Sequence, residues 1–112
     1  RRGSSMKITE EQVEKNLEYL TSTDLDEAVS KVEKLRLEKM EKNIIGKLKR
    51  DRFNNYKSDV EKTTQAYASD EYEQWVKDVC DATLEYETLN NKRNTAEHYD
   101  SMYQSMIKRG AV

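Results

Sequence analysis

The sequence lacks several features that define whole classes of protein. It has no proline and three glycines in 112 residues, which argues against a many-stranded β fold with tight turns. One cysteine excludes a disulfide framework and a multi-thiolate metal site. No apolar run approaches the roughly 20 residues of a membrane span, and no stretch has the pattern of a signal peptide.

Charge is what the sequence has in excess. Charged residues make up 38% of the chain and apolar residues 35%, a balance typical of a soluble, intracellular, mostly helical protein. Residues 1–5 look like an expression-tag remnant, and we expect residues 6–112 to form a single helical domain. A chain that is this small and polar buries little surface on folding. A long amphipathic helix must also cover its apolar stripe, and we therefore expect the protein to self-associate.

Capping signals predict the first two helices. A capping box at Thr9–Gln12 opens a short helix, and the hydroxyl side chains of residues 21–23 are expected to end it. Asp24, with Glu27, then caps a long helix that continues until it weakens near residues 53–56. Its apolar residues, spaced by three or four, are expected to share one face: Leu25, Ala28, Val29, Val32, Leu37, Met40, Ile44 and Leu48.

Further signals divide the second half of the chain. The asparagines of residues 53–56 favour a break, and a capping box at Ser58 opens a short helix to about Ala68. Ser69 or Asp70 caps a long final helix, and Gly110 ends it. The predicted fold is all-α: an elongated helical hairpin of two long helices with short accessory helices.

Charge is divided unevenly along the chain. Residues 31–57 carry a net charge of +6, and residues 58–91 carry −7. The densest basic run combines cations, which neutralise phosphates, with rings, which stack on unpaired bases, and so predicts a site for single-stranded DNA. Its residues are Lys47, Lys49, Arg50, Arg52, Phe53, Tyr56 and Lys57. The alternative interpretation is a solvated helix face, and the acidic block of residues 70–87 either pairs with this run or binds a basic partner.

Residues with catalytic or metal-binding chemistry are few. His98 is the only histidine and Cys80 the only cysteine, and together they do not supply the three or four ligands of a metal site. Cys80 is expected to be a small buried apolar residue rather than a nucleophile. We find no phosphate-binding loop and no catalytic triad. The sequence therefore predicts no catalytic residue, no metal, no cofactor and no enzymatic activity.

The chain from Lys47 onward resembles small phage proteins encoded among recombination and replication genes. The similar elements are the basic run before a break, the Ala68–Tyr72 junction and the segment from Glu85 to Ala96. The layout is also similar to that of the UvsY-like recombination mediators of phages, with a basic, aromatic-flanked segment before a long helix.

This resemblance implies a homo-oligomer in the cytoplasm of the host cell that binds single-stranded DNA and assists recombinase loading. A recombinase or a single-strand-binding protein is then an expected partner. Lys49, Arg50 and Arg52 occupy the stretch that contacts DNA in that family. Its final helix mediates self-association, which implies interface roles for Trp75, Val79, Tyr86, Leu89, Tyr99 and Met102.

Two other hypotheses stay open at this point. The second hypothesis is a phage protein that binds and inhibits a host protein. Its acidic helix, residues 70–87, would imitate DNA on the DNA-binding surface of that protein. A structural coiled-coil module with no nucleic-acid affinity is the third hypothesis, although Arg93 and Ala82 suit a long uniform zipper poorly.

Overall fold

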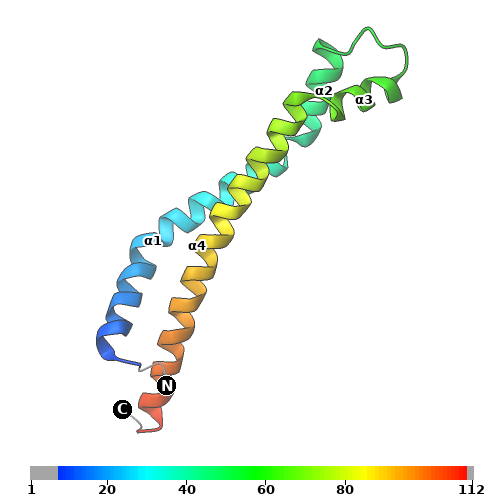
Figure 1. Cartoon of the computed structure of the whole chain (residues 1–112). Helices are drawn as coiled ribbons and strands as arrows, with labels where there is room; N and C mark the ends of the chain where they lie inside the picture. The colour runs from blue at the N-terminus through cyan, green and yellow to red at the C-terminus, as the bar shows by residue number, and fades with distance from the viewer. Residues whose placement is uncertain (1–7, 111–112) are drawn as a thin grey trace. The chain divides into compact units, whose positions relative to one another are not determined.

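The computed structural model describes residues 8–110, which form four helices and no strand. The prediction of an all-α fold is therefore confirmed. None of these helices is long and apolar enough to cross a membrane. The predicted tag remnant, residues 1–5, lies outside the described residues. The helices, coloured along the chain in Figure 1, are α1 (Glu10–Glu38), α2 (Glu41–Asp51), α3 (Asp59–Tyr67) and α4 (Asp70–Lys108).

The chain divides into two compact units, and both long helices contribute a segment to each. Of the described residues, 8–28 and 87–110 form unit 1, and residues 29–86 form unit 2. The division falls inside α1 and α4 rather than at a linker. The assignment of residues 6–112 to a single domain stays a prediction.

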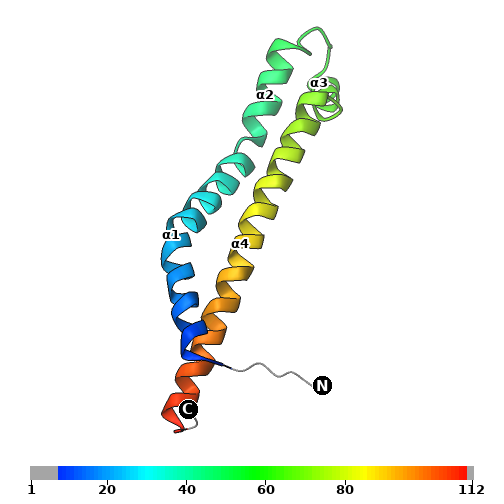
Figure 2. The same cartoon turned by 60° about the vertical axis from the view of Figure 1, so that its left-hand side comes forward.

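Each unit contains an antiparallel pair of helix segments. In unit 1, Asn16 Nδ2 of α1 donates a hydrogen bond to Asp100 Oδ1 of α4, 3.2 Å away. In unit 2, where Figure 2 shows α2 and α3 joined by a loop, Trp75 Nε1 of α4 donates to Leu37 O of α1 at 2.8 Å. Residues late in one helix thus meet residues early in the other. The predicted hairpin of two long helices with short accessory helices is confirmed.

The predicted capping residues are found at four helix ends. Thr9 Oγ1 accepts from Gln12 N at 3.1 Å and caps α1. Ser58 Oγ accepts from Glu61 N at 3.1 Å and caps α3, and Ser69 Oγ accepts from Tyr72 N at 3.2 Å and caps α4. Gly110, with φ 69°, follows the end of α4, a conformation that glycine adopts without steric cost. These signals succeed because each involves atoms within three residues of one another.

The predicted break at residues 21–23 is wrong, because α1 continues through it. The hydroxyls of Ser22 and Thr23 both donate to Tyr19 O, at 3.0 and 2.7 Å. The side chains are therefore satisfied inside the helix and do not compete with its backbone bonds. Asp24 consequently lies inside α1 and caps nothing.

The helix predicted to run unbroken to residues 53–56 is divided, because α1 ends at Glu38 and α2 begins at Glu41. The predicted break at residues 53–56 is confirmed, since α2 ends at Asp51 and α3 begins at Asp59. Met40 N donates to Leu37 O at 3.1 Å, which tightens the last turn of α1. The Trp75 indole donates to the same carbonyl oxygen. A tertiary hydrogen bond therefore stabilises a helix end that the local sequence does not mark.

The apolar face predicted for α1 points largely to solvent. Val29 and Val32 are 58% and 63% exposed, whereas Ser30 is buried. The covered side of α1 is mixed: Val13 is buried, and the carbonyl oxygens of Leu20 and Leu37 accept from side chains of α4, because a buried donor needs an acceptor. The expectation of one buried apolar face is wrong for Leu25, Ala28, Val29 and Val32, which are exposed, whereas further along Leu37, Met40 and Ile44 are half-buried and Leu48 is buried.

Candidate nucleic-acid interface

α2 is amphipathic and packs through its apolar side within unit 2. Leu48 is buried, and Ile44 and Ile45 are half-buried. The Tyr72 hydroxyl donates to Glu41 Oε2 at 2.8 Å, which ties the start of α2 to the start of α4. This hydrogen bond to the carboxylate, aided by burial, stabilises the protonated phenol and raises the pKa of Tyr72 to about 12.

The opposite side of α2 carries donors and no acid. The helical neighbours of Gly46 at three and four residues in either direction share its face. They are Lys42, Asn43, Lys49 and Arg50, and with Gly46 they form what we call the cationic face of α2. Lys49 is half-buried, and the other four residues are exposed. Lys49 and Arg50 belong to the site predicted from the sequence, whereas Lys42, Asn43 and Gly46 do not. Helical spacing alone places all five residues on one face of the helix.

Gly46 lowers the stability of α2. A glycine inside an exposed helix destabilises it by about 1 kcal/mol relative to alanine. A Cβ atom at Gly46 would meet no other atom within 4 Å, so packing within this chain does not require glycine.

Three cations of the predicted DNA site form ion pairs. Lys49 Nζ lies 2.6 Å from Asp59 Oδ1 of α3, Arg50 Nε lies 3.1 Å from Asp51 Oδ1, and Arg52 pairs with Glu71. The hydrogen bonds from Lys49 and Arg52 hold the pKa values of Asp59 and Glu71 below their usual range. All three pairs are substantially exposed, so each contributes little stability and a phosphate competes with the carboxylate at low cost.

The remaining predicted site residues lie at the end of α2 and in the following loop. Lys47 and Lys57 are exposed, and Phe53 and Tyr56 are half-buried. The Arg52 guanidinium lies 5.0 Å from the centre of the Phe53 ring, and the Phe53 and Tyr56 rings are 6.2 Å apart. Two rings beside a cationic helix are the combination that single-stranded nucleic acid needs.

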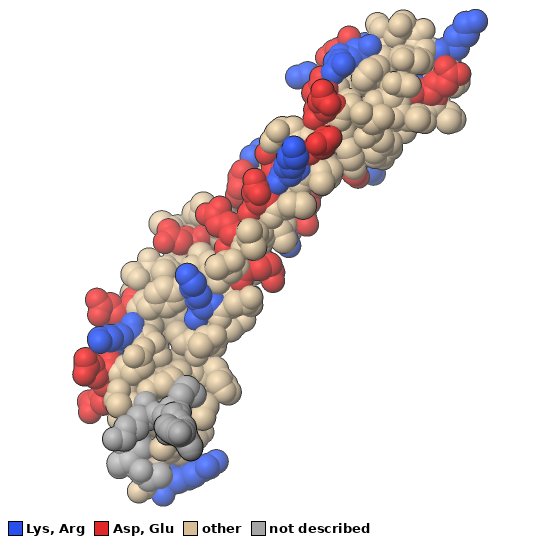
Figure 3. All heavy atoms as spheres, in the orientation of Figure 1, with Lys and Arg blue, Asp and Glu red and all other residues tan. Residues whose placement is uncertain are grey.

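The acidic residues of α4 do not neutralise this basic segment as a block. Among the described residues, Glu71 is the one acid of residues 70–85 that pairs with it, while Glu73 pairs with Lys77 of its own helix. Asp78, Asp81 and Glu85 are exposed. Figure 3 shows carboxylates distributed over the molecular surface on the face that it presents.

The residues predicted for an oligomer interface mostly have partners inside the chain. Trp75 donates to Leu37 O, the Tyr86 ring lies 5.7 Å from Lys34 Nζ, and the Tyr99 hydroxyl accepts from Thr9 N at 2.9 Å. Val79 and Leu89 are half-buried, and Met102 is more exposed. The interface role of these six residues stays a prediction.

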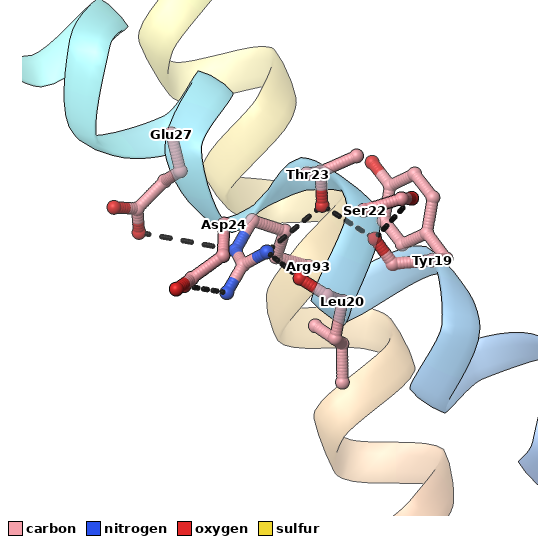
Figure 4. Close-up of polar contacts among 7 residues, drawn as sticks. All are labelled: Tyr19, Leu20, Ser22, Thr23, Asp24, Glu27 and Arg93. Carbon is pink, nitrogen blue, oxygen red and sulfur yellow. Dashed lines mark hydrogen bonds and ion pairs between the residues drawn. The ribbon is translucent and has the colours of Figure 1, made fainter.

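Unit 1 contains a buried arginine whose role the sequence analysis missed. Figure 4 shows the Arg93 guanidinium inserted among residues of α1. It donates to Leu20 O at 2.7 Å, to Thr23 Oγ1 at 2.8 Å and to Asp24 Oδ1 at 3.2 Å, and Glu27 Oε2 lies 3.9 Å from Arg93 Nε. The signal in the sequence is the spacing of Arg93, which follows Leu89 by four residues and precedes Ala96 by three and so shares a helix face with apolar residues.

Cys80 and His98 stand apart from any cluster of ligands. Cys80 is exposed and not buried as predicted. It follows the half-buried Val79 by one position, and neighbouring residues of a helix point in different directions. Among the described residues, no group of three or more His, Cys, Asp and Glu is placed to hold a metal ion.

Comparisons of this chain with protein-family models, curated proteins and solved structures found no match.

Proposed function

We propose that this protein binds single-stranded DNA through unit 2, as a non-enzymatic, mediator-like accessory of phage recombination. The observation that carries the proposal is the cationic face of α2, whose own five residues include no acid, followed by Phe53 and Tyr56. Cations hold the phosphates, and the rings stack on bases that are not paired. The recombination setting and the expected assistance to a recombinase come from the sequence resemblance alone.

Anisotropy of a labelled single-stranded oligonucleotide, measured with tag-free protein over a salt series, tests the proposal. If each binding unit neutralises about five phosphates, log K falls against log salt with a slope of roughly −3.5. We expect weaker binding to a duplex of the same length, because paired bases do not offer their faces to the rings. Absence of binding at low salt contradicts the proposal.

We also propose that the protein self-associates through the part of α1 that lies in unit 2, with a second copy of the chain covering its exposed apolar residues. Val29, Val32 and Leu35 follow one another at three-residue intervals on α1 and are all exposed. Burial of such a row against a second copy removes apolar surface from water.

Introducing charge on this surface tests self-association. The double variant Val29→Lys, Val32→Glu keeps the net charge, and we expect it to be monomeric in sedimentation velocity where the parent chain is oligomeric. The control Asn91→Lys, Gln104→Glu makes the same charge change at exposed positions of α4 and should leave the oligomer intact. If the α1 variant forms the same oligomer as the parent chain, the interface does not lie on this surface of α1. Met102 and its neighbours are then the next surface to test.

The exposed acidic residues of α4 favour a second candidate function. Asp78, Asp81 and Glu85 offer carboxylates to a basic partner, as a protein that imitates DNA does. A chain that fails to bind the oligonucleotide but prevents a DNA-binding protein from doing so identifies this function instead.

A further inference from the structure

Gly46 occupies the centre of the cationic face of α2. Its four neighbours on the helix surface are three cations and one amide, Lys42, Lys49, Arg50 and Asn43. The apolar side of α2 faces away from this surface. A ligand that approaches Gly46 therefore meets three cations and one amide, and two of these cations are held in exposed ion pairs with Asp59 and Asp51.

The structure gives no internal reason for glycine at this position. No atom of the described chain would obstruct a Cβ there, and alanine would favour the helix more strongly. A glycine in a helix also lets another molecule come close to the backbone. Since nothing in the chain uses that space, an external molecule accounts for it better than packing does.

We propose that the sugar-phosphate backbone of single-stranded nucleic acid crosses α2 at Gly46 and lies against the helix backbone there. Lys42 on one side and Lys49 with Arg50 on the other bind consecutive phosphates. Asn43 adds an amide donor. This inference rests on the proposed function and specifies where on unit 2 the nucleic acid lies.

An uncharged side chain at Gly46 separates close contact from general attraction by charge. Gly46→Gln lengthens the side chain without changing any charge, and Gly46→Ala adds only a methyl group. We expect both variants to melt at a higher temperature than the parent chain, because each removes a glycine from a helix. For a labelled oligothymidylate at 0.1 M salt, we expect Gly46→Gln to bind about fivefold more weakly, the effect of losing one phosphate contact. Gly46→Ala should lie between it and the parent chain.

Thr88→Gln, at an exposed position of α4, is the matched control and should bind like the parent chain. Weaker binding by a more stable Gly46→Gln protein supports the inference, because misfolding does not explain it. If the parent chain binds and Gly46→Gln binds equally well, the inference is wrong and the proposed function stands. If the parent chain does not bind, both are wrong.

Discussion

Replacement of Arg93 by alanine should destabilise unit 1 by about 3 kcal/mol, the usual effect of removing one partner from a buried, charged hydrogen-bond cluster. Arg93 is 9% exposed, and its guanidinium serves three acceptors on α1. The variant loses these bonds and leaves a cavity between α1 and α4 within unit 1. Urea unfolding followed by circular dichroism at 222 nm measures the loss.

Two variants establish the cause. Arg93→Lys keeps the charge but not the planar fork of donors, so it should recover only part of the stability. Lys92→Ala removes the neighbouring exposed side chain and should change the free energy of unfolding by less than about 0.5 kcal/mol. Equal effects of Arg93→Ala and Lys92→Ala would show that the cluster does not stabilise unit 1.

Reversal of two charges beside Gly46 should have the largest effect on DNA binding. The double variant Lys42→Glu, Lys47→Glu should bind a single-stranded oligonucleotide about 25-fold more weakly at 0.1 M salt and flatten the log–log salt slope by about 1.4, as expected for two lost phosphate contacts. Both lysines are exposed, and neither forms an ion pair among the described residues. Their replacement therefore breaks no ion pair of the described residues, whereas replacement of Lys49 or Arg52 also breaks a pair with Asp59 or Glu71.

A charge-matched variant separates the site from the net charge of the protein. Lys77→Glu, Lys92→Glu on α4 alters the net charge by the same amount at exposed positions. We expect it to bind nearly as tightly as the parent chain, because contacts to phosphate depend on short distances in salt. Equal weakening by the two double variants would contradict the assignment to α2.

The charge-reversal variants and the Gly46 variants test different contributions to DNA binding. Charge reversal alters the electrostatic attraction of the cationic face, whereas Gly46→Gln alters only how closely the nucleic acid approaches it. A protein that attracts nucleic acid without a defined contact responds to the first change alone. A protein that holds the backbone against α2 responds to both.

The basic run could be identified from the sequence because its cations are contiguous. Its pairing could not be, since Asp59 and Glu71 reach Lys49 and Arg52 only after α3 and α4 have packed beside α2. The cationic face of α2 was available from helical spacing alone. Lys42 and Gly46 precede the dense basic run in the sequence, and only a comparison of residues three and four apart groups them with Lys49 and Arg50.

Local patterns in the sequence correctly predict the all-α class, the starts of α1, α3 and α4 and the end of α4. Each helix start depends on residues within one helical turn, such as Ser58 with Glu61 or Ser69 with Tyr72. The buried face of α1 and the residue at which α1 ends depend instead on contacts between residues far apart in the chain. Arg93 reaches Leu20 across 73 residues of chain, and Trp75 reaches Leu37 across 38. A buried donor must find an acceptor wherever the fold supplies one, and these acceptors become available only when the helices of each unit have packed.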